Sequence, residues 1–284
     1  MIRRASYIIL PILVAPALHA QPGGDTAAVV AAAHARIVEA GPALGPATWP
    51  GFRPDTLPHV YVLPGRGTML FGWRGALPEG WTRTADGAAW LPDADRGAAS
   101  TGIELGGRGA AQVVVRRLDT GELAGLTAHE SFHVFQRASR AQGRRFGAGE
   151  NSMLLSSYPV FDVENEAMVA LEGRLLRAAL AAADDSAAAR ATREFLAVRA
   201  ARQRRLARSM AEFEDAAELN EGLAEYALHR ATSSGRAPAA LLSALEGLMG
   251  DGRSSIRLRF YATGPALAYL LDRLGGAEWK QRLM

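Results

Sequence analysis

The stretch AAQVVVRRLDTGELAGLTAHESFHVFQ, residues 110–136, contains the change of pattern that decides the fold. Its first part, up to Leu118, is rich in valine, which is typical of a strand. From Gly121 onward, apolar residues such as Phe132 and Phe135 recur at helical spacing. The stretch therefore predicts a strand followed directly by a helix, at the junction between a sheet and a helical region.

The flanking sequence extends both patterns. Residues 59–118 consist of short apolar runs separated by Gly, Pro and Asp, which is typical of a small antiparallel or mixed sheet. From residue 119 to the C-terminus nearly every segment has the period of a helix. The sequence therefore predicts an α+β fold, in which a sheet lobe, 59–118, precedes a mainly helical lobe, 119–284. Within the second lobe we expect a helical pair at about 164–217.

The N-terminus has the features of a secretory signal peptide. Arg3 and Arg4 precede an apolar run from Tyr7 to Leu18, and small residues follow up to Ala20. The run is too short to span a bilayer comfortably, and we expect no later stretch to approach the ~20 apolar residues that a spanning helix requires. These features predict residues 1–20 as a signal peptide, cleavage near Ala20, and an exported protein that is periplasmic or secreted, with no membrane span after the signal peptide is removed.

Residues 21–58 are predicted to form an N-terminal helix and a loop. Asp25 can cap a helix that ends at Gly41. The Pro- and Gly-rich residues that follow favour irregular structure, so we expect a connecting loop before the first strand.

The amino-acid composition limits which side chains could bind a metal and which partners are expected. The 284 residues are 49% hydrophobic, enough for a real core, and contain no cysteine, so any metal must be held by histidine and carboxylate. The chain has 32 basic and 29 acidic residues, and loss of the signal peptide brings the two close to balance. An arginine cluster at 190–208 fits the solvated face of a long helix, and we expect no nucleic-acid partner.

His129, Glu130 and His133 form an H-E-x-x-H pattern. On a helix, residues four apart lie one turn above each other, so the two imidazoles can face one ion. The carboxylate of Glu130 can then reach a water molecule on that ion, which is why this spacing suits zinc hydrolysis. The alternative is a pair of histidines that are exposed or hydrogen-bonded within the core.

A catalytic zinc site needs a third protein ligand, with the fourth position left to water. The remaining histidines have no suitable spacing, so we expect a carboxylate. Two downstream segments offer one: ELNEGLAEYALH contains Glu221, and DVENEAMVALEG contains Glu166. We favour Glu221, because Gly222 would let a substrate backbone approach and Glu225 lies one turn further on. Glu166 remains the rival metal ligand.

Together, H-E-x-x-H and NEGLAEY resemble the gluzincins, the thermolysin-like zinc metallopeptidases, over about residues 113–231. The resemblance implies a zincin-like catalytic domain at 59–284, bound Zn²⁺, Glu221 as the third ligand, and Glu225 hydrogen-bonded to a ligand histidine. One feature departs from thermolysin, where the third ligand follows closely. Here Glu221 lies 88 residues after His133, so the helical pair would be an insertion.

The function predicted is hydrolysis of a peptide or protein substrate by a zinc-activated water, with Glu130 as the general base. Tyr261 and Tyr158 are candidates for a second group that stabilises the oxyanion. The strand at 110–118 is a candidate edge for pairing with an extended peptide. The alternative function is a zincin-fold protein without general peptidase activity, which acts as a binding or scaffold module or on one specific partner.

Overall fold

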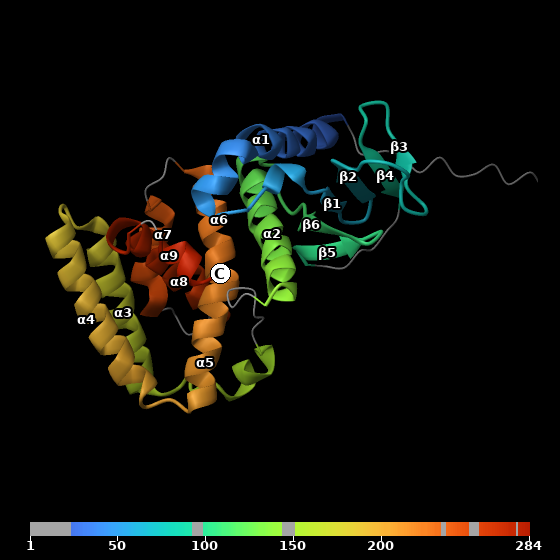
Figure 1. Ribbon diagram of the computed structural model, residues 1–284. Helices are drawn as coiled ribbons and strands as arrows, with labels where there is room; N and C mark the ends of the chain where they lie inside the picture. Colours follow the sequence, from blue (N-terminus) through green and yellow to red (C-terminus); the bar gives the residue numbers. More distant parts are fainter. Residues whose placement is uncertain (1–23, 93–98, 144–150, 234–236, 250–255, 277) are drawn as a thin grey trace, which may run out of the picture.

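The computed structural model describes residues 24–92, 99–143, 151–233, 237–249, 256–276 and 278–284 (Figure 1). The predicted signal peptide lies outside the described residues. As the sequence predicted, the fold is α+β, with a mixed sheet and a mainly helical remainder.

The described residues form one six-stranded sheet with the order β3-β4-β2-β1-β6-β5. Its strands are β1 (His59–Leu63), β2 (Gly67–Phe71), β3 (Thr82–Arg83), β4 (Ala89–Pro92), β5 (Thr101–Leu105) and β6 (Arg108–Val114). Strands β1 and β6 are parallel, and the other pairs are antiparallel. The prediction that the 110–118 strand supplies a free edge is therefore wrong, because β6 is paired on both sides. Strand β5 is the edge on that side of the sheet.

Helix α2 (Thr120–Ala141) follows β6 directly and joins the two parts of the molecule. Asp119 caps it by accepting a hydrogen bond from the backbone N–H of Glu122 at 2.7 Å. Leu123 and Ala128 of α2 pack in the core under the sheet, whereas Phe132 belongs to the core of the helical part. The motif helix thus lies at the junction that the sequence indicated.

Helix α1 (Gly24–Thr48) is longer than predicted and includes the residues expected to form a loop. Gly41 does not end it, because the chain folds back against the helix at this point. A Cβ on Gly41 would lie 2.5 Å from the Cβ of Asp55, and one on Gly45 would lie 2.1 Å from the carbonyl oxygen of Phe52. Both glycines therefore permit close packing with the next segment, which includes the 3₁₀ turn η1 (Pro54–Thr56).

Among the described helices, α1 is long and apolar enough, by length and composition alone, to cross a membrane. The expectation that no stretch after the signal peptide has this character is therefore wrong. Val30, Ala33 and Ile37 of this helix are buried against the sheet side of the molecule.

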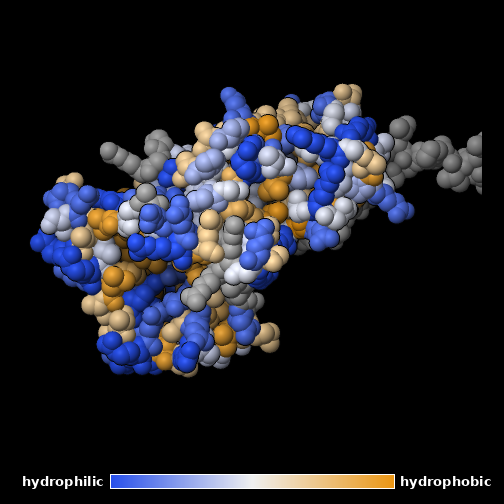
Figure 2. Space-filling model, viewed as in Figure 1, coloured by the Kyte–Doolittle hydropathy of each residue, from blue (hydrophilic) through white to orange (hydrophobic). Residues whose placement is uncertain are grey.

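Helices α3 (Val163–Ala181) and α4 (Asp185–Gln203) form an antiparallel hairpin on one side of the molecule (Figure 1). The predicted helical pair at about 164–217 is three helices in the structure, because α4 ends at Gln203 and α5 (Arg208–Ala217) runs separately. Across the turn between them, Arg202, near the end of α4, binds Glu214 of α5 at 2.6 Å. Hydrophilic residues cover much of the outer side of the hairpin (Figure 2), but Arg199 and Arg202 of the predicted solvated cluster are largely buried.

The remaining elements surround the end of α2. A π-helical turn, η4 (Glu218–Gly222), leads into α6 (Leu223–Thr232), which packs along α2. Helix α8 (Ile256–Leu274) packs on both η4 and α6. The other elements are the short helices η3 (Ser152–Ser157), α7 (Ala239–Glu246), η5 (Gly247–Met249) and α9 (Trp279–Arg282).

A histidine pair where α1 meets β1 should make stability depend on pH. His59 donates from Nε2 to the carbonyl oxygen of Pro54 at 3.1 Å, and its Nδ1 lies 2.9 Å from Nδ1 of His34. Burial lowers the pKa of His34 to about 4 and that of His59 to about 3. The unfolded chain takes up these protons near pH 6.5 and the folded chain does not, so stability should fall as pH drops from about 6.5 towards 4.

Each of the two histidines should add about 1.4 kcal/mol per pH unit to this slope in the free energy of unfolding. Denaturant unfolding at several pH values measures it. The variant His34→Asn should show a shallower slope than the parent, and an unchanged slope would contradict the assignment.

Candidate metal centre

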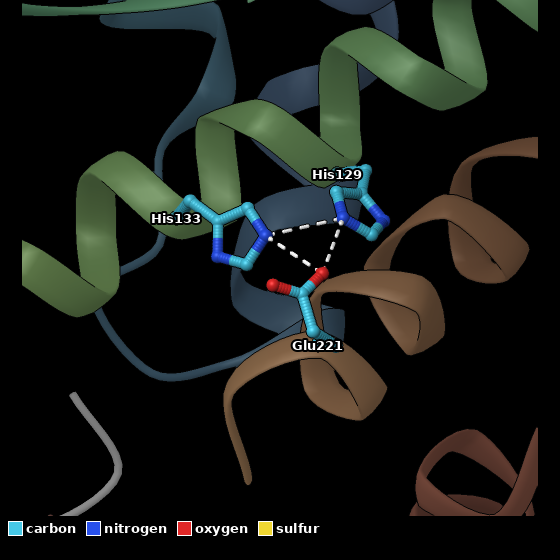
Figure 3. A group of neighbouring side chains, drawn as sticks. All are labelled: His129, His133 and Glu221. Atoms are coloured by element: carbon cyan, nitrogen blue, oxygen red, sulfur yellow. Dashed lines mark hydrogen bonds and ion pairs between the residues drawn. The ribbon is translucent and has the colours of Figure 1, made fainter. Parts of the chain in front are cut away.

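Helix α2 and the π-helical turn η4 bring three candidate ligands together (Figure 3). The Nε2 atoms of His129 and His133 lie 3.1 Å apart. Oε2 of Glu221 is 3.6 Å from the first and 3.4 Å from the second. His129 and Glu221 are buried, whereas His133 is partly exposed.

These distances can be compared with the geometry that zinc requires. Zinc binds imidazole nitrogen and carboxylate oxygen at about 2.0–2.1 Å in a tetrahedron, which separates neighbouring ligand atoms by about 3.3 Å. The three measured separations, 3.1, 3.4 and 3.6 Å, lie close to that value. Two imidazoles and one carboxylate are also a donor set that zinc accepts. The residues present therefore fit a zinc ion, with a fourth position left for water.

The outer nitrogens of both histidines have hydrogen-bond acceptors. Nδ1 of His129 donates to Oε2 of Glu225 at 3.1 Å, the contact expected from the resemblance. Nδ1 of His133 donates to Oε1 of Gln136 at 2.8 Å. Because Nδ1 carries the hydrogen in each neutral ring, Nε2 presents its lone pair towards the shared position.

Gln136 is a site residue that the sequence analysis missed. Its Nε2 donates to the carbonyl oxygens of Leu219 and Asn220 in η4, at 2.8 and 3.0 Å. One buried amide thus orients His133 and fixes the turn that carries Glu221. Its position three residues after His133, on the same face of the helix, was the signal available in the sequence.

Replacing Gln136 by leucine should lower zinc affinity about 10- to 100-fold, the usual effect of losing a partner of a metal-binding histidine. Competition with a chromophoric zinc chelator measures the affinity. The matched control is Gln112→Leu, which removes another buried glutamine, in β6, away from the histidines. Equal losses of affinity in both variants would contradict a specific role for Gln136.

Glu130 lies on α2 beside the two histidines and is buried. Its Oε2 has no hydrogen-bond partner among the described residues. Burial raises the pKa of Glu130, although the neighbouring His129 and His133 act in the opposite direction. A buried carboxylate oxygen without a partner is costly unless another molecule completes its contacts. A water molecule on the shared ion position would do so.

Helix α8 covers the carboxylate from the other side. The hydroxyl of Tyr261 donates to Oε2 of Glu221 at 2.5 Å, and its ring stacks on that of His129 at 5.8 Å. This approach depends on contact between two backbones, because a Cβ on Gly264 of α8 would lie 2.4 Å from the Cα of Gly222. Tyr261, one of the two tyrosines predicted from the sequence, is therefore next to the site.

The candidate ligands shift one another's pKa values. Burial lowers the pKa of His129, but hydrogen bonds to Glu221 and Glu225 outweigh it and raise the pKa to about 10. Burial raises the pKa of Glu221, but hydrogen bonds with His129 and His133 hold that pKa well below its usual range. A metal ion bound here must therefore displace a proton from His129, and metal affinity should increase with pH.

Two predicted site residues lie elsewhere. The hydroxyl of Tyr158 donates to Glu214 in a separate buried cluster, so the structure does not bring this tyrosine to the two histidines. Glu166, the rival ligand, pairs with Arg259 and is not in the group that could hold a metal. Its position early in α3 directs it to α8 rather than to the histidines.

The chain matches no family model, no curated protein and no solved structure. The geometry of the His129, His133 and Glu221 group is therefore the observation that supports a function.

Proposed function

We propose that the protein is a zinc-dependent peptidase, in which Glu130 is the general base. The observation that carries the proposal is the separation of 3.1–3.6 Å among two imidazole nitrogens and a carboxylate oxygen from distant segments. The unpartnered Oε2 of Glu130 supports it, because a metal site alone would not need a buried free carboxylate beside it.

Zinc, when bound, would supply a water molecule of lowered pKa and polarise the carbonyl of the substrate. Glu130 takes the proton from the attacking water and returns it to the leaving amine. Its raised pKa suits both transfers, since the carboxylate must accept a proton and then release it. The hydroxyl of Tyr261 is the proposed donor to the oxyanion, for which it would have to exchange its present acceptor, Oε2 of Glu221.

Edge strand β5 is the proposed place for an extended peptide. A Cβ on Gly102 of β5 would lie 3.0 Å from Cγ2 of Val134 and 2.2 Å from Nη2 of Arg137, so the strand passes close to α2. Glu130, Val134 and Arg137 share one face of that helix. A peptide added to β5 would lie beside the general base, and its backbone would pair with the strand.

We place this activity outside the cytoplasm, on the strength of the signal-peptide pattern in residues 1–20.

The test has two stages. The mature chain is purified, zinc per chain is measured, and a broad peptide library is then supplied with and without a chelator. We expect one zinc per chain and cleavage that the chelator abolishes and zinc restores. Zinc without cleavage would favour a binding or scaffold role, and a chain that takes up no zinc would refute the proposal.

A further inference from the structure

Arg137 lies on α2, one turn after His133 and two turns after Glu130. Its side chain is exposed, and it forms no hydrogen bond or ion pair with any residue that the structure describes. Partial burial and Arg140 lower the pKa of Arg137, whereas Glu130 and Glu104 raise it. The guanidinium is therefore a cation near the proposed general base, and no described residue accepts from its five N–H groups.

The guanidinium of Arg137 lies against edge strand β5, which runs beside α2 (Figure 1). Gly102 of this strand is buried, and a Cβ on it would lie 2.2 Å from Nη2 of Arg137. A side chain at position 102 would have to displace the cation. The guanidinium thus occupies the place that a side chain of β5 would otherwise fill.

The backbone groups of Gly102 point to the outer edge of the sheet. Its partner in β6 is Ala111, whose N–H donates to the carbonyl oxygen of Pro58, towards β1 and away from β5. Gly102 and Ala111 are therefore a pair without mutual hydrogen bonds. The carbonyl oxygen of Gly102 accepts from the hydroxyl of Thr101 at 3.3 Å and keeps a second lone pair. An extended peptide can pair with these outward groups.

Such a peptide would place one side chain next to the guanidinium. Residues directly opposite each other in neighbouring strands point to the same face of the sheet, with their Cβ atoms about 5 Å apart. The side-chain face of Gly102 is the one towards α2, where Nη2 of Arg137 lies. The peptide residue opposite Gly102 would direct its side chain to this guanidinium, at a distance that Asp or Glu can span.

The acidic groups of the site restrict where a carboxylate of the substrate can lie. Glu130 and Glu221 are close together at the proposed zinc position, and Glu104 lies on β5 itself. All three would repel an anionic side chain. Arg137 offsets this repulsion at Gly102, so an acidic residue is favoured at that position and disfavoured elsewhere along the peptide.

We propose that Arg137 is a specificity-determining residue that binds the side chain of Asp or Glu in the substrate residue paired with Gly102. This inference rests on the proposed function. Glu130 and Arg137 are separated by a rise of about 10 Å along α2, the length of about three residues of an extended peptide. The contact is therefore made about three residues from the scissile bond. It should strengthen binding about 3- to 10-fold, since it is bidentate but exposed.

The test measures peptide binding to the zinc-loaded Glu130→Gln variant by calorimetry, so that no turnover is needed. The probes are extended peptides with blocked ends and no other charge, which carry one Glu at each position in turn. Each has a twin with Gln at that position. We expect Glu to bind at least 3-fold more tightly than Gln at one position. Equal or weaker binding of Glu at every position would overturn the proposal.

Substitutions in the same background separate Arg137 from zinc and from the general field of the helix. Arg137→Gln should abolish the preference. Arg137→Glu should reverse it, so that Lys at the responsive position binds more tightly than Gln. The matched control is Arg140→Gln, which removes an equal charge from the same helix one turn further from Glu130, and it should keep the preference. A preference retained in Arg137→Gln, or lost equally in Arg140→Gln, would overturn the proposal.

The preference is read in every variant as the ratio of the dissociation constants of two twins, so a general loss of affinity cancels. Failure of the two ideas is distinguishable. A chain that prefers the Glu peptide through Arg137 and cleaves no peptide refutes only the peptidase. A chain that cleaves peptides, with the same ratio in the parent and in Arg137→Gln, refutes only the role of Arg137.

Discussion

Replacing Glu130 by glutamine is expected to lower kcat for peptide hydrolysis by about 10²- to 10⁴-fold, the range for loss of a general acid or base. Glutamine keeps the size of the side chain but cannot take a proton from water. The proposed zinc ligands, His129, His133 and Glu221, are unchanged, so the variant should still bind one zinc per chain.

Steady-state kinetics and metal analysis of the same preparation check this expectation together. The matched control is Glu122→Gln, on the same helix but partly exposed and paired with Arg117 at 2.9 Å. It should retain parental kcat. Full activity in Glu130→Gln would remove Glu130 from the mechanism.

Replacing Glu221 by alanine is expected to lower zinc affinity by more than the 10- to 100-fold typical of a residue that only supports a ligand. The change removes the single anionic donor and leaves His129 and His133 alone to hold the ion. Zinc per chain after dialysis, and affinity by chelator competition, measure the effect.

Glu166→Ala is the informative control for this second prediction, because Glu166 was the rival ligand and pairs instead with Arg259. It should keep its zinc and lose some stability, since a buried arginine loses its partner. The opposite pattern, with zinc lost in Glu166→Ala and kept in Glu221→Ala, would show that the ligand has been assigned wrongly.

The local features of this protein could be predicted from its sequence. Short apolar runs located most strands, and apolar residues at a period of 3.6 located most helices. The spacing of His129 and His133 also fixed their common face, because residues four apart on a helix have little freedom to separate. These features depend only on residues within one or two helical turns of each other, and they are present in the structure.

Features set by long-range packing were harder to predict. Gly41 looks like a helix terminator, yet it allows Asp55 to pack against a continuing helix. The choice between Glu221 and Glu166 depends on how the α3–α4 hairpin returns the chain to α2, which no local spacing encodes. Tyr158 and Tyr261 were equivalent in sequence terms, and only the packing of α8 on η4 brings Tyr261 to the histidines.

Glu221 lies 88 residues after His133 in the sequence, so the three proposed ligands come together only in the folded chain. His129 and His133 lie one turn apart on a single helix, whereas Glu221 lies on a separate turn, η4, which is held in place by the packing of α8. A chain that is not yet folded would therefore lack the third proposed ligand and hold a metal ion weakly. For the peptidase proposed above, hydrolysis would begin only when folding is finished, so unfolded copies of the chain would not be cut.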